Sequence, residues 1–567
     1  MPKPRPSSPA NSLRELQRIK AVYLPGVAST KRRLLEQLER AVFSRARDVL
    51  GLHEALCWLR AYPDEPELLA VVERMLARFD KRRDLRRHRH ALRDSGIAGT
   101  EIRFRFFWPT AVRLTAHWPD RLTIDWPAFE KAGRLDPLLS LLTLHAESPG
   151  LDEYAYTPRQ WVRRLKGPRE TDAAFLVRRF DALRMDEPAR GAMYDDLDPP
   201  MRLAPGPDTP ARTRARYPDA PVVFQARPLD TSRPRLADAY RRPIAGERAL
   251  SREQGRALID LAGDAMVTRS RDLDVFAYGD PDDVRLLDCG DGLQLACIGA
   301  RPERRLLLEA VYGFLTLKNG VPIGYVLASA LNRSSEIAYN VFETYRGGES
   351  SRIYGQVVAC IRHLFGADAF TVFPYQLGGD GNDEGLRSGA FWFYRKLGFA
   401  PRAPEARAVL AREDARMEAR PRHRSDLATL RRLAAHNVFW QPGSRRRDDV
   451  IGVLNLPNVG LHVTRYVAER FGSDRERASR ACSADAAALL GVRSFRAWTP
   501  GERLAWQRWA PLVMVLPGVS GWSRANRRSL AAVVRAKGGR RESDFVRLFD
   551  AHGPLRRAIR RLAQDEL

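Results

Sequence analysis

The stretch LLLEAVYGFLTLKNGVPIGYVLASAL constrains the fold more than any other part of this chain. It contains two runs rich in β-branched and aromatic residues, which are joined at Asn319-Gly320. Asn-Gly strongly favours the two-residue turn of a β-hairpin, because both turn positions require a positive φ. The sequence therefore predicts a hairpin here, and a hairpin needs further strands beside it to be stable.

Residues 251–402 alternate between strand-like and helix-like patterns on both sides of this hairpin. A capped helical segment opens the region, and VRLLDCGDGLQLACIGA alternates like a pair of strands. After the hairpin we expect a strand over 336–345, an amphipathic helix, a strand at AFTVFPYQL and a closing helix that ends at a glycine. This order predicts a mixed β-sheet flanked by helices.

The patterns outside this region predict four further segments. Residues 1–25 are polar and contain several prolines, so we expect them to be disordered. Residues 26–186 have mainly helical spacing of apolar side chains, whereas residues 187–250 are dense in Pro, Asp, Arg and Gly and indicate a linker or strap. Residues 403–567 form a basic, helical region. The expected fold class is α+β, with a central mixed sheet between two mainly α-helical regions.

The charge of the chain favours an anionic partner. The formal net charge is +26, and residues 403–567 contain 32 Arg and Lys against 17 Asp and Glu. Such an excess is typical of contact with nucleic acid or another polyanion. A GC-rich genome also produces arginine-rich chains without such a partner. Nucleic-acid contact by this region and a merely solvated basic surface therefore both stay open.

Cysteine use and hydropathy limit the cellular setting. The five cysteines are odd in number and none has CxxC spacing, which argues against a disulfide framework or a zinc site and predicts buried, reduced thiols. The first residues contain no apolar signal segment, and no apolar run approaches the roughly 18 residues of a membrane-spanning helix. We expect a soluble, bacterial-type cytoplasmic protein with no metal and no membrane partner.

The order of elements in residues 251–402 resembles that of the GNAT acetyltransferase superfamily. Three features carry the resemblance: the hairpin that leads into the strand 336–345, the loop ETYRGGESSRIYGQ before an amphipathic helix, and AFWFYRKLGF, which is similar to the family's closing helix A-x-x-F-Y-x-x-x-G-F. The resemblance implies a GNAT-like domain over 251–402. It also implies N-acyl transfer from acetyl-CoA or another acyl-CoA to an amine of an unidentified acceptor, with the helical flanks selecting a large one.

The loop corresponds to the family pattern [Q/R]-x-x-G-x-[G/A], whose backbone N–H groups hold the pyrophosphate of acyl-CoA. A helix N-terminus suits an anion because its first N–H groups lack intrahelical partners and the helix dipole is positive there. In the family's splayed-strand arrangement, the backbone at the end of the preceding strand faces the pantetheine arm. By resemblance, the expected acyl-CoA contacts are Val341, Phe342, Arg346, Gly347, Gly348, Ser350 and Ser351.

Two side chains match the family's acid and base. Tyr394 has the place of the tyrosine that protonates the leaving thiolate, and Glu336 has that of the glutamate that accepts a proton from the acceptor. The alternatives are an aromatic core residue for Tyr394 and a rim carboxylate for Glu336. Glu349 stands where the family has glycine, which favours a second hypothesis, a catalytically inactive GNAT-like scaffold or ligand sensor. A third hypothesis is a nucleic-acid-associated protein that uses the basic C-terminal region.

Overall fold

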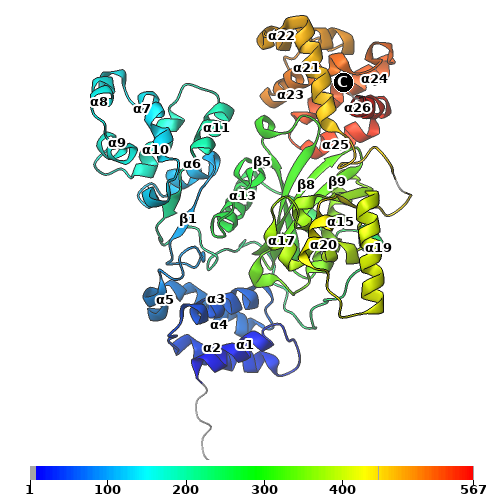
Figure 1. The fold of residues 1–567 in the computed structure, drawn as a ribbon. Coiled ribbons are helices and arrows are strands. Elements are labelled where there is room, and N and C mark those ends of the chain that lie inside the picture. The colour runs from blue at the N-terminus through cyan, green and yellow to red at the C-terminus, as the bar shows by residue number, and fades with distance from the viewer. Residues whose placement is uncertain (1–7, 445, 566–567) are drawn as a thin grey trace, which may run out of the picture. The chain divides into compact units, whose positions relative to one another are not determined.

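The computed structural model describes residues 8–444 and 446–565, and the chain divides into two compact units. Unit 1 comprises Met1–Leu229, Ala257–Tyr278 and Lys318–Pro322, and unit 2 comprises Asp230–Arg256, Gly279–Leu317 and Ile323–Leu567. Figure 1 follows the chain through both units from its N-terminus in blue to its C-terminus in red.

Unit 1 is mainly helical and contains one small antiparallel sheet. The strands β1 (Ile102–Phe104), β2 (Leu122–Ile124) and β3 (Met201–Leu203) are arranged in the order β1-β3-β2. Buried side chains around this sheet, among them Trp108, Phe180 and Tyr194, form one hydrophobic core. The helices of the unit are α1 (Pro9–Ile19), α2 (Val27–Arg40), α3 (Ala46–Ala61), α4 (Pro66–Ala77), η1 (Phe79–Lys81), α5 (Arg83–His88), α6 (Trp108–His117), η2 (Trp126–Ala128), η3 (Ala132–Leu135), α7 (Asp136–Leu142), η4 (His145–Glu147), α8 (Ser148–Glu153), α9 (Pro158–Leu165), α10 (Asp172–Asp181), α11 (Glu187–Leu197) and α14 (Asp274–Ala277).

The disorder predicted for residues 1–25 is wrong for most of the described part of this segment. Residues 9–19 form α1, which begins after Ser8 with a proline in its first turn. Its apolar side chains at positions 13, 16 and 19 are buried, which is the spacing of one helix face. Residues 1–7, which the same prediction covers, lie outside the described residues.

The segment 187–250 has more regular structure than a linker. It contains α11, β3, α12 (Leu236–Arg241) and β4 (Gly246–Ala249), and β3 is the middle strand of the small sheet. The irregular part between them crosses α3, where Arg60 Nη1 donates to the carbonyl of Thr213 (2.8 Å) and His53 Nε2 lies 2.9 Å from Thr213 Oγ1. Proline and glycine therefore indicated the irregular stretches correctly but not the short elements between them.

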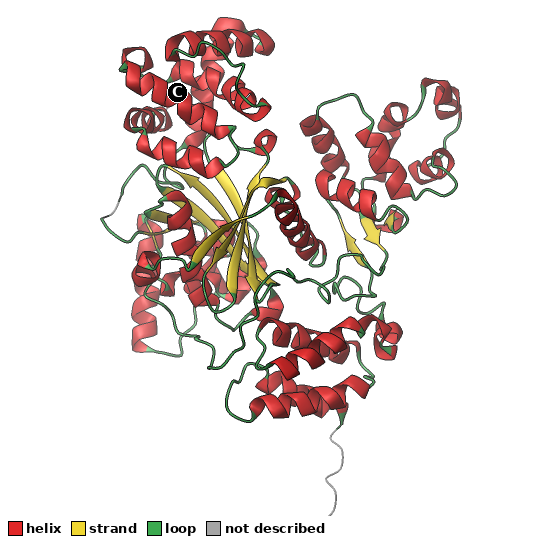
Figure 2. Ribbon diagram, turned by 180° about the vertical axis from the view of Figure 1, so that it is seen from behind, coloured by secondary structure: helices red, strands yellow, loops and turns green. Residues whose placement is uncertain are grey.

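Unit 2 is built on a nine-stranded sheet with the strand order β11-β12-β10-β9-β8-β7-β6-β5-β4. Figure 2 shows the twist of this sheet in yellow. β9 pairs antiparallel with β8 and parallel with β10, so the sheet is mixed. Besides β4, its strands are β5 (Gly279–Asp288), β6 (Leu293–Ala300), β7 (Ala310–Lys318), β8 (Val321–Leu331), β9 (Ser334–Val341), β10 (Ala369–Val372), β11 (Ala400–Pro401) and β12 (Val438–Trp440).

Helices flank this sheet, and those of the C-terminal region gather beside one end of it (Figures 1 and 2). Helix α13 (Arg252–Val267) contributes residues to both units. Besides α12, the helices of unit 2 are η5 (Pro302–Arg304), η6 (Glu343–Tyr345), α15 (Ser350–Phe365), α16 (Pro374–Leu377), α17 (Asp383–Ser388), α18 (Ala390–Lys396), α19 (Pro404–Ala419), α20 (Leu427–Ala434), α21 (Leu456–Phe471), α22 (Arg475–Leu490), α23 (Pro500–Val515), η7 (Val519–Gly521), α24 (Arg524–Lys537), α25 (Glu542–Ala551) and α26 (Gly553–Gln564).

The predicted mixed sheet with flanking helices is confirmed. β7 and β8 meet at Asn319 and Gly320, whose φ angles of 50° and 78° are the positive values that the Asn-Gly turn requires. The strand expected over 336–345 is shorter at its end, because β9 stops at Val341 and residues 343–345 form the 3-10 helix η6.

The region 403–567 is not wholly helical. β12 lies inside the sheet between β10 and β11, so this region contributes a strand to the fold of the preceding one. Phe370 of β10 and Trp440 of β12 pack with ring centroids 5.6 Å apart. Three residues of β12 are too few to produce an alternating pattern, and therefore the sequence did not reveal this strand.

A buried polar cluster joins the C-terminal helices to the sheet. Arg305 Nη1 donates to the carbonyl of Lys537 (2.9 Å), and the backbone N–H of Glu542 donates to Asp283 Oδ2 (3.1 Å). Tyr312 donates its hydroxyl proton to the same Asp283 oxygen (2.6 Å). Lys537 Nζ lies 2.6 Å from Glu542 Oε1, and both side chains are buried. Burial lowers the pKa of Lys537 and raises that of Glu542.

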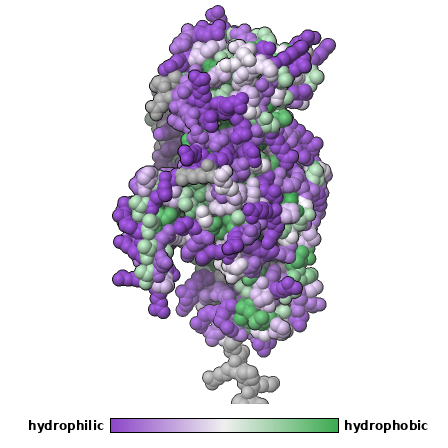
Figure 3. All heavy atoms as spheres, turned by 90° about the vertical axis from the view of Figure 1, so that its right-hand side faces the viewer, coloured by the Kyte–Doolittle hydropathy of each residue, from purple (hydrophilic) through white to green (hydrophobic). Residues whose placement is uncertain are grey.

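One face of the molecule is mostly polar, and the thiols are inside. Figure 3 shows that hydrophilic residues make up most of the face turned toward the viewer. Among the described residues, no helix is long and apolar enough to cross a membrane. All five cysteines are buried and free, as expected.

Candidate functional site

The strands β9 and β10 separate from each other within the sheet. Their parallel pairing runs from Ser334 opposite Ala369 to Glu336 opposite Thr371. β9 then continues to Val341, and over this length its pairing is with β8. One edge of β9 beyond Glu336 therefore has no strand beside it among the described residues, and its backbone borders a gap.

Alternation along β9 determines which backbone groups face this gap. The N–H of Asp368, just before β10, donates to the carbonyl of Arg333, just before β9 (2.8 Å). In a β-ladder, every second residue directs its N–H and C=O to the same neighbouring strand. The odd-numbered residues of β9 therefore point toward β10, and beyond the paired part Tyr339 and Val341 direct their backbone groups into the gap.

The backbone groups of Val341 and Phe342, the two residues expected to contact acyl-CoA at the end of this strand, point in different directions. The N–H of Phe342 donates to the carbonyl of Ile323 (2.9 Å), and its own carbonyl accepts a bond from η6, so its backbone does not face the gap. The carbonyl of Val341 does face it and accepts from Arg346 Nε (3.3 Å). Sequence reasoning missed Tyr339, because the end of pairing with β10 cannot be read from the residues.

Tyr394 lies on α18 with its ring in an aromatic cluster beside the gap. Its ring centroid is 5.6 Å from that of Tyr354, and its hydroxyl forms a hydrogen bond with the backbone of Tyr339. Burial raises the pKa of Tyr394, the charge of Glu336 raises it further, and the bond with Tyr339 opposes both. The phenol therefore keeps its proton at neutral pH and is available as a donor.

Glu336 is the last residue of β9 that pairs with β10. It lies opposite Ser329 of β8, which forms a hydrogen bond with its side chain. Burial raises the pKa of Glu336 to about 8, the carboxylate of Glu309 adds to this, and the bond with Ser329 acts in the opposite direction. Because Glu336 also affects the pKa of Tyr394, the structure brings the two predicted catalytic side chains into one electrostatic environment.

Two further tyrosines belong to this site. Tyr354 of α15 is fully buried, and its hydroxyl has no hydrogen-bond partner among the described residues. Tyr339 packs against it with ring centroids 5.4 Å apart and donates its hydroxyl proton to the carbonyl of Ser350 (3.1 Å). A buried hydroxyl without a partner is rare in native proteins and is often explained by a ligand or water. Tyr354 follows the loop closely in the sequence. Its helical spacing, however, predicts only a core residue, so the sequence did not indicate that it belongs to the site.

The loop before α15 is open on the side of its glycines. Gly347 has a φ of +83° and nothing within 4 Å of the position a Cβ would take. The backbone N–H groups in the first turn of α15, which includes Ser350 and Ser351, lack intrahelical acceptors. The N-cap residue Glu349 makes no side-chain capping bond to them. Arg346 is partly exposed and pairs with Glu384 of α17 (2.6 Å).

Glu349 occupies the position before the first residue of α15, and its side chain is buried. Arg352 Nη1 donates to its carboxylate (2.6 Å), and Nη2 of the same guanidinium pairs with Asp291 of the β5–β6 turn. Arg352 therefore offsets part of the negative charge of Glu349, because the same guanidinium also pairs with Asp291. The Glu349 carboxylate does not point into open solvent, and Arg352 is the cation beside it.

Comparisons with known proteins do not identify the chain: no family model, no curated protein and no solved structure matches it. In the part of the chain that the structure describes, no group of three or more His, Cys, Asp or Glu side chains is arranged to hold a metal ion.

Proposed function

We propose that unit 2 is an acyl-CoA-dependent N-acyltransferase of the GNAT type. The observation that carries the proposal is the separation of β9 from β10 after Glu336, which leaves the backbone of Tyr339 and Val341 beside a gap. This gap opens next to the uncapped N-terminus of α15. By the resemblance, the pantetheine arm of acyl-CoA lies along such a strand edge and its pyrophosphate lies at such a helix N-terminus.

The residues around the gap fit such a ligand. The carbonyl of Tyr339 and the N–H of Val341 are able to pair with amide groups of a pantetheine arm, as a missing strand would, whereas the Tyr339 N–H bonds with Tyr394 and the Val341 carbonyl with Arg346. The first turn of α15 supplies N–H groups and a positive dipole end for the pyrophosphate. Arg346 is able to exchange its exposed pairing with Glu384 for a phosphate oxygen, because an exposed ion pair contributes little stability.

Two side chains supply the proton transfers. The Glu336 carboxylate accepts a proton from the acceptor amine, and a base with a pKa of about 8 matches the operating pH better than an ordinary glutamate. Tyr394 holds its proton beside the backbone of Tyr339 and donates it to the thiolate that leaves. The acceptor amine then carries the acyl group, and the thiol leaves with one proton.

A second candidate function is a GNAT-like scaffold or ligand sensor without turnover. It is favoured by Glu349, because a carboxylate beside the first turn of α15 weakens the field that an anion would experience. Its pairing with Arg352 reduces this effect but does not remove the charge from the loop. Binding of acetyl-CoA without release of free thiol would distinguish the scaffold from the enzyme.

We expect full-length protein to bind acetyl-CoA, and we expect Arg346→Glu to weaken this binding at least about tenfold. The change removes a guanidinium that suits a phosphate group and places a carboxylate beside it. Isothermal titration calorimetry of acetyl-CoA into the full chain measures both affinities.

Arg387→Glu is the matched control, because Arg387 is exposed on α17 near Glu384 and the substitution makes the same charge change. Its affinity for acetyl-CoA is expected to stay within about twofold of the wild type. Absence of binding by the folded wild-type chain, or equal weakening in both variants, would contradict the proposed pyrophosphate contact.

A further inference from the structure

A second polar site lies at the opposite end of β9. A pocket of about 230 Å³ is lined by Asn332, Asp449, Gly553, Arg556, Arg557 and Arg560. β9 spans eight residues at about 3.3 Å each, which places the start of the strand roughly 25 Å from its end at the gap. The pocket is therefore distinct from the site proposed for acyl-CoA.

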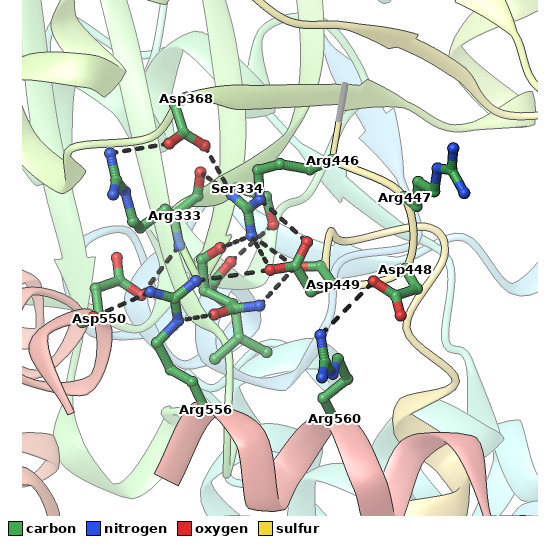
Figure 4. Close-up of polar contacts among 12 residues, drawn as sticks. Arg333, Ser334, Asp368, Arg446, Arg447, Asp448, Asp449, Asp550, Arg556 and Arg560 are labelled. Carbon is green, nitrogen blue, oxygen red and sulfur yellow. Dashed lines mark hydrogen bonds and ion pairs between the residues drawn. The ribbon is translucent and has the colours of Figure 1, made fainter. Parts of the chain in front are cut away.

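Arg556, which lines the pocket, is held in place by two neighbouring segments. Arg556 Nε donates to Asn332 Oδ1, and Asn332 Nδ2 donates to the carbonyl of Asp449 (2.5 Å). Figure 4 shows Arg556 and Arg560 projecting from α26 toward the loop that carries Asp449. Arg446 fixes this loop, because its Nη2 also donates to the carbonyl of Asn332 (2.6 Å). The wall of the pocket is therefore built before any ligand binds.

The carboxylates beside the pocket are already neutralised. Arg446 lies 2.9 Å from Asp449 Oδ2 and 2.7 Å from Asp368 Oδ1. Arg560 is 3.9 Å from Asp448, which also accepts from Gln564 Nε2 (3.0 Å). Two arginines of α26 share these carboxylates, because Arg560 is a partner of Asp448 and Arg556 Nη2 lies 3.6 Å from Asp449 Oδ2.

Arg557 and Arg447 add positive charge that is not balanced nearby. Both side chains are exposed, and neither has a hydrogen bond or ion pair with another described residue. Arg557 lines the pocket, and Figure 4 shows Arg447 at the edge of the same loop. The pocket also lies at the first two turns of α26, where the helix dipole adds partial positive charge.

We propose that this pocket binds a phosphate group. Guanidinium groups pair with phosphate oxygens through two parallel N–H bonds. Arg556, Arg557 and Arg560 line the same small space, and among the described residues Arg557 has no carboxylate partner in it. The free ion and the phosphate of an RNA strand share this chemistry. If the phosphate group belongs to RNA, the pocket is a nucleic-acid contact of the basic C-terminal region. If it is a free phosphate ion, the pocket is a small-molecule site.

The test uses full-length protein at low salt and two probes, inorganic phosphate and a ten-nucleotide single-stranded RNA. The double variant Arg557→Ala/Arg560→Ala removes two of the three guanidinium groups, and alanine at these helical positions preserves α26. Arg477→Ala/Arg480→Ala is the matched control, because it removes two exposed arginines from α22. Calorimetry is used for phosphate, and fluorescence anisotropy of labelled RNA is used for the oligonucleotide.

We expect at least a tenfold loss of affinity for one or both probes in the pocket variant, and less than a twofold change in the control. Loss of phosphate binding identifies a free phosphate site, and loss of RNA binding alone identifies a phosphodiester contact; either supports the proposal. Binding of neither probe by the wild type, or equal losses in the two double variants, would overturn it. None of these outcomes depends on acetyl-CoA binding.

Discussion

Replacing Glu336 by glutamine is expected to lower kcat at least about 100-fold, because a positioned general base contributes a factor of that order or more. Glutamine keeps the size of the side chain and its ability to bond with Ser329, but it cannot accept a proton from an amine. Release of free thiol from acetyl-CoA in the presence of a panel of amines measures the effect. Binding of acetyl-CoA itself is expected to change little, because Glu336 lies at the inner end of the gap and not at the loop before α15.

The pH dependence of the reaction separates a catalytic role of Glu336 from a structural one. Burial raises the pKa of this carboxyl to about 8, so the base is mostly protonated at pH 7. The value of kcat/KM for the wild type is therefore expected to rise with pH and to level off above about 8. In Glu336→Gln this part of the rise is expected to disappear.

Glu343→Gln is the control for this prediction. Glu343 is an exposed carboxylate in η6, two residues after the end of β9. Its replacement is expected to leave both kcat and the pH profile unchanged. Equal activity in Glu336→Gln and the wild type would exclude Glu336 as the base, and an equal loss in both variants would indicate a general charge effect.

Replacing Lys537 by methionine is expected to lower the free energy of unfolding of unit 2 by about 3 to 5 kcal/mol. Lys537 is buried, pairs with the buried Glu542 at 2.6 Å and donates to the carbonyl of Glu309 (2.8 Å). Methionine has a similar length, but it leaves the carboxyl of Glu542 buried without its nearest cation. Urea unfolding followed by tryptophan fluorescence reports this loss, because Trp506 and Trp509 are buried in α23.

Arg535→Met on the same helix is the matched control. Arg535 is about half exposed and pairs with Glu502 at 2.9 Å, and such a surface pair contributes only about 0 to 1 kcal/mol. Adding Glu542→Leu to Lys537→Met is expected to recover part of the stability, because the unpaired buried acid is then removed. A loss below about 1 kcal/mol in Lys537→Met would contradict a structural role of the buried pair.

The sequence predicted those elements of unit 2 that are determined by a few neighbouring residues, such as a turn or the apolar face of a helix. The Asn319-Gly320 turn fixes the β7–β8 hairpin, because few other dipeptides adopt two positive φ angles. The spacing of Ile353, Val357 and Ile361 marks α15, whose buried face carries all three residues. The choice of Glu336 and Tyr394 followed from the resemblance. Glu336 lies in β9, and Tyr394 of α18 bonds with the backbone of Tyr339 in the same strand.

Features that depend on distant pairing could not be predicted. β12 enters the sheet from a region that otherwise has helical spacing, and only its partner β10 makes three residues a strand. Tyr339 faces the gap because β10 ends early, and the length of one strand does not determine that of its neighbour. Ser8 and the apolar residues of α1 were overlooked because prolines dominate the composition of the first residues.

Hydrogen–deuterium exchange of the full-length protein with and without acetyl-CoA tests the central claim most directly. If the gap between β9 and β10 holds the ligand, the backbone amides of residues 337–341 and of the first turn of α15 will exchange more slowly when acetyl-CoA is present. The amides of β5 and β6 serve as an internal reference and are expected to exchange at the same rate in both samples. Unchanged exchange over residues 337–353 at saturating acetyl-CoA, or protection confined to other parts of the chain, would contradict the proposed site.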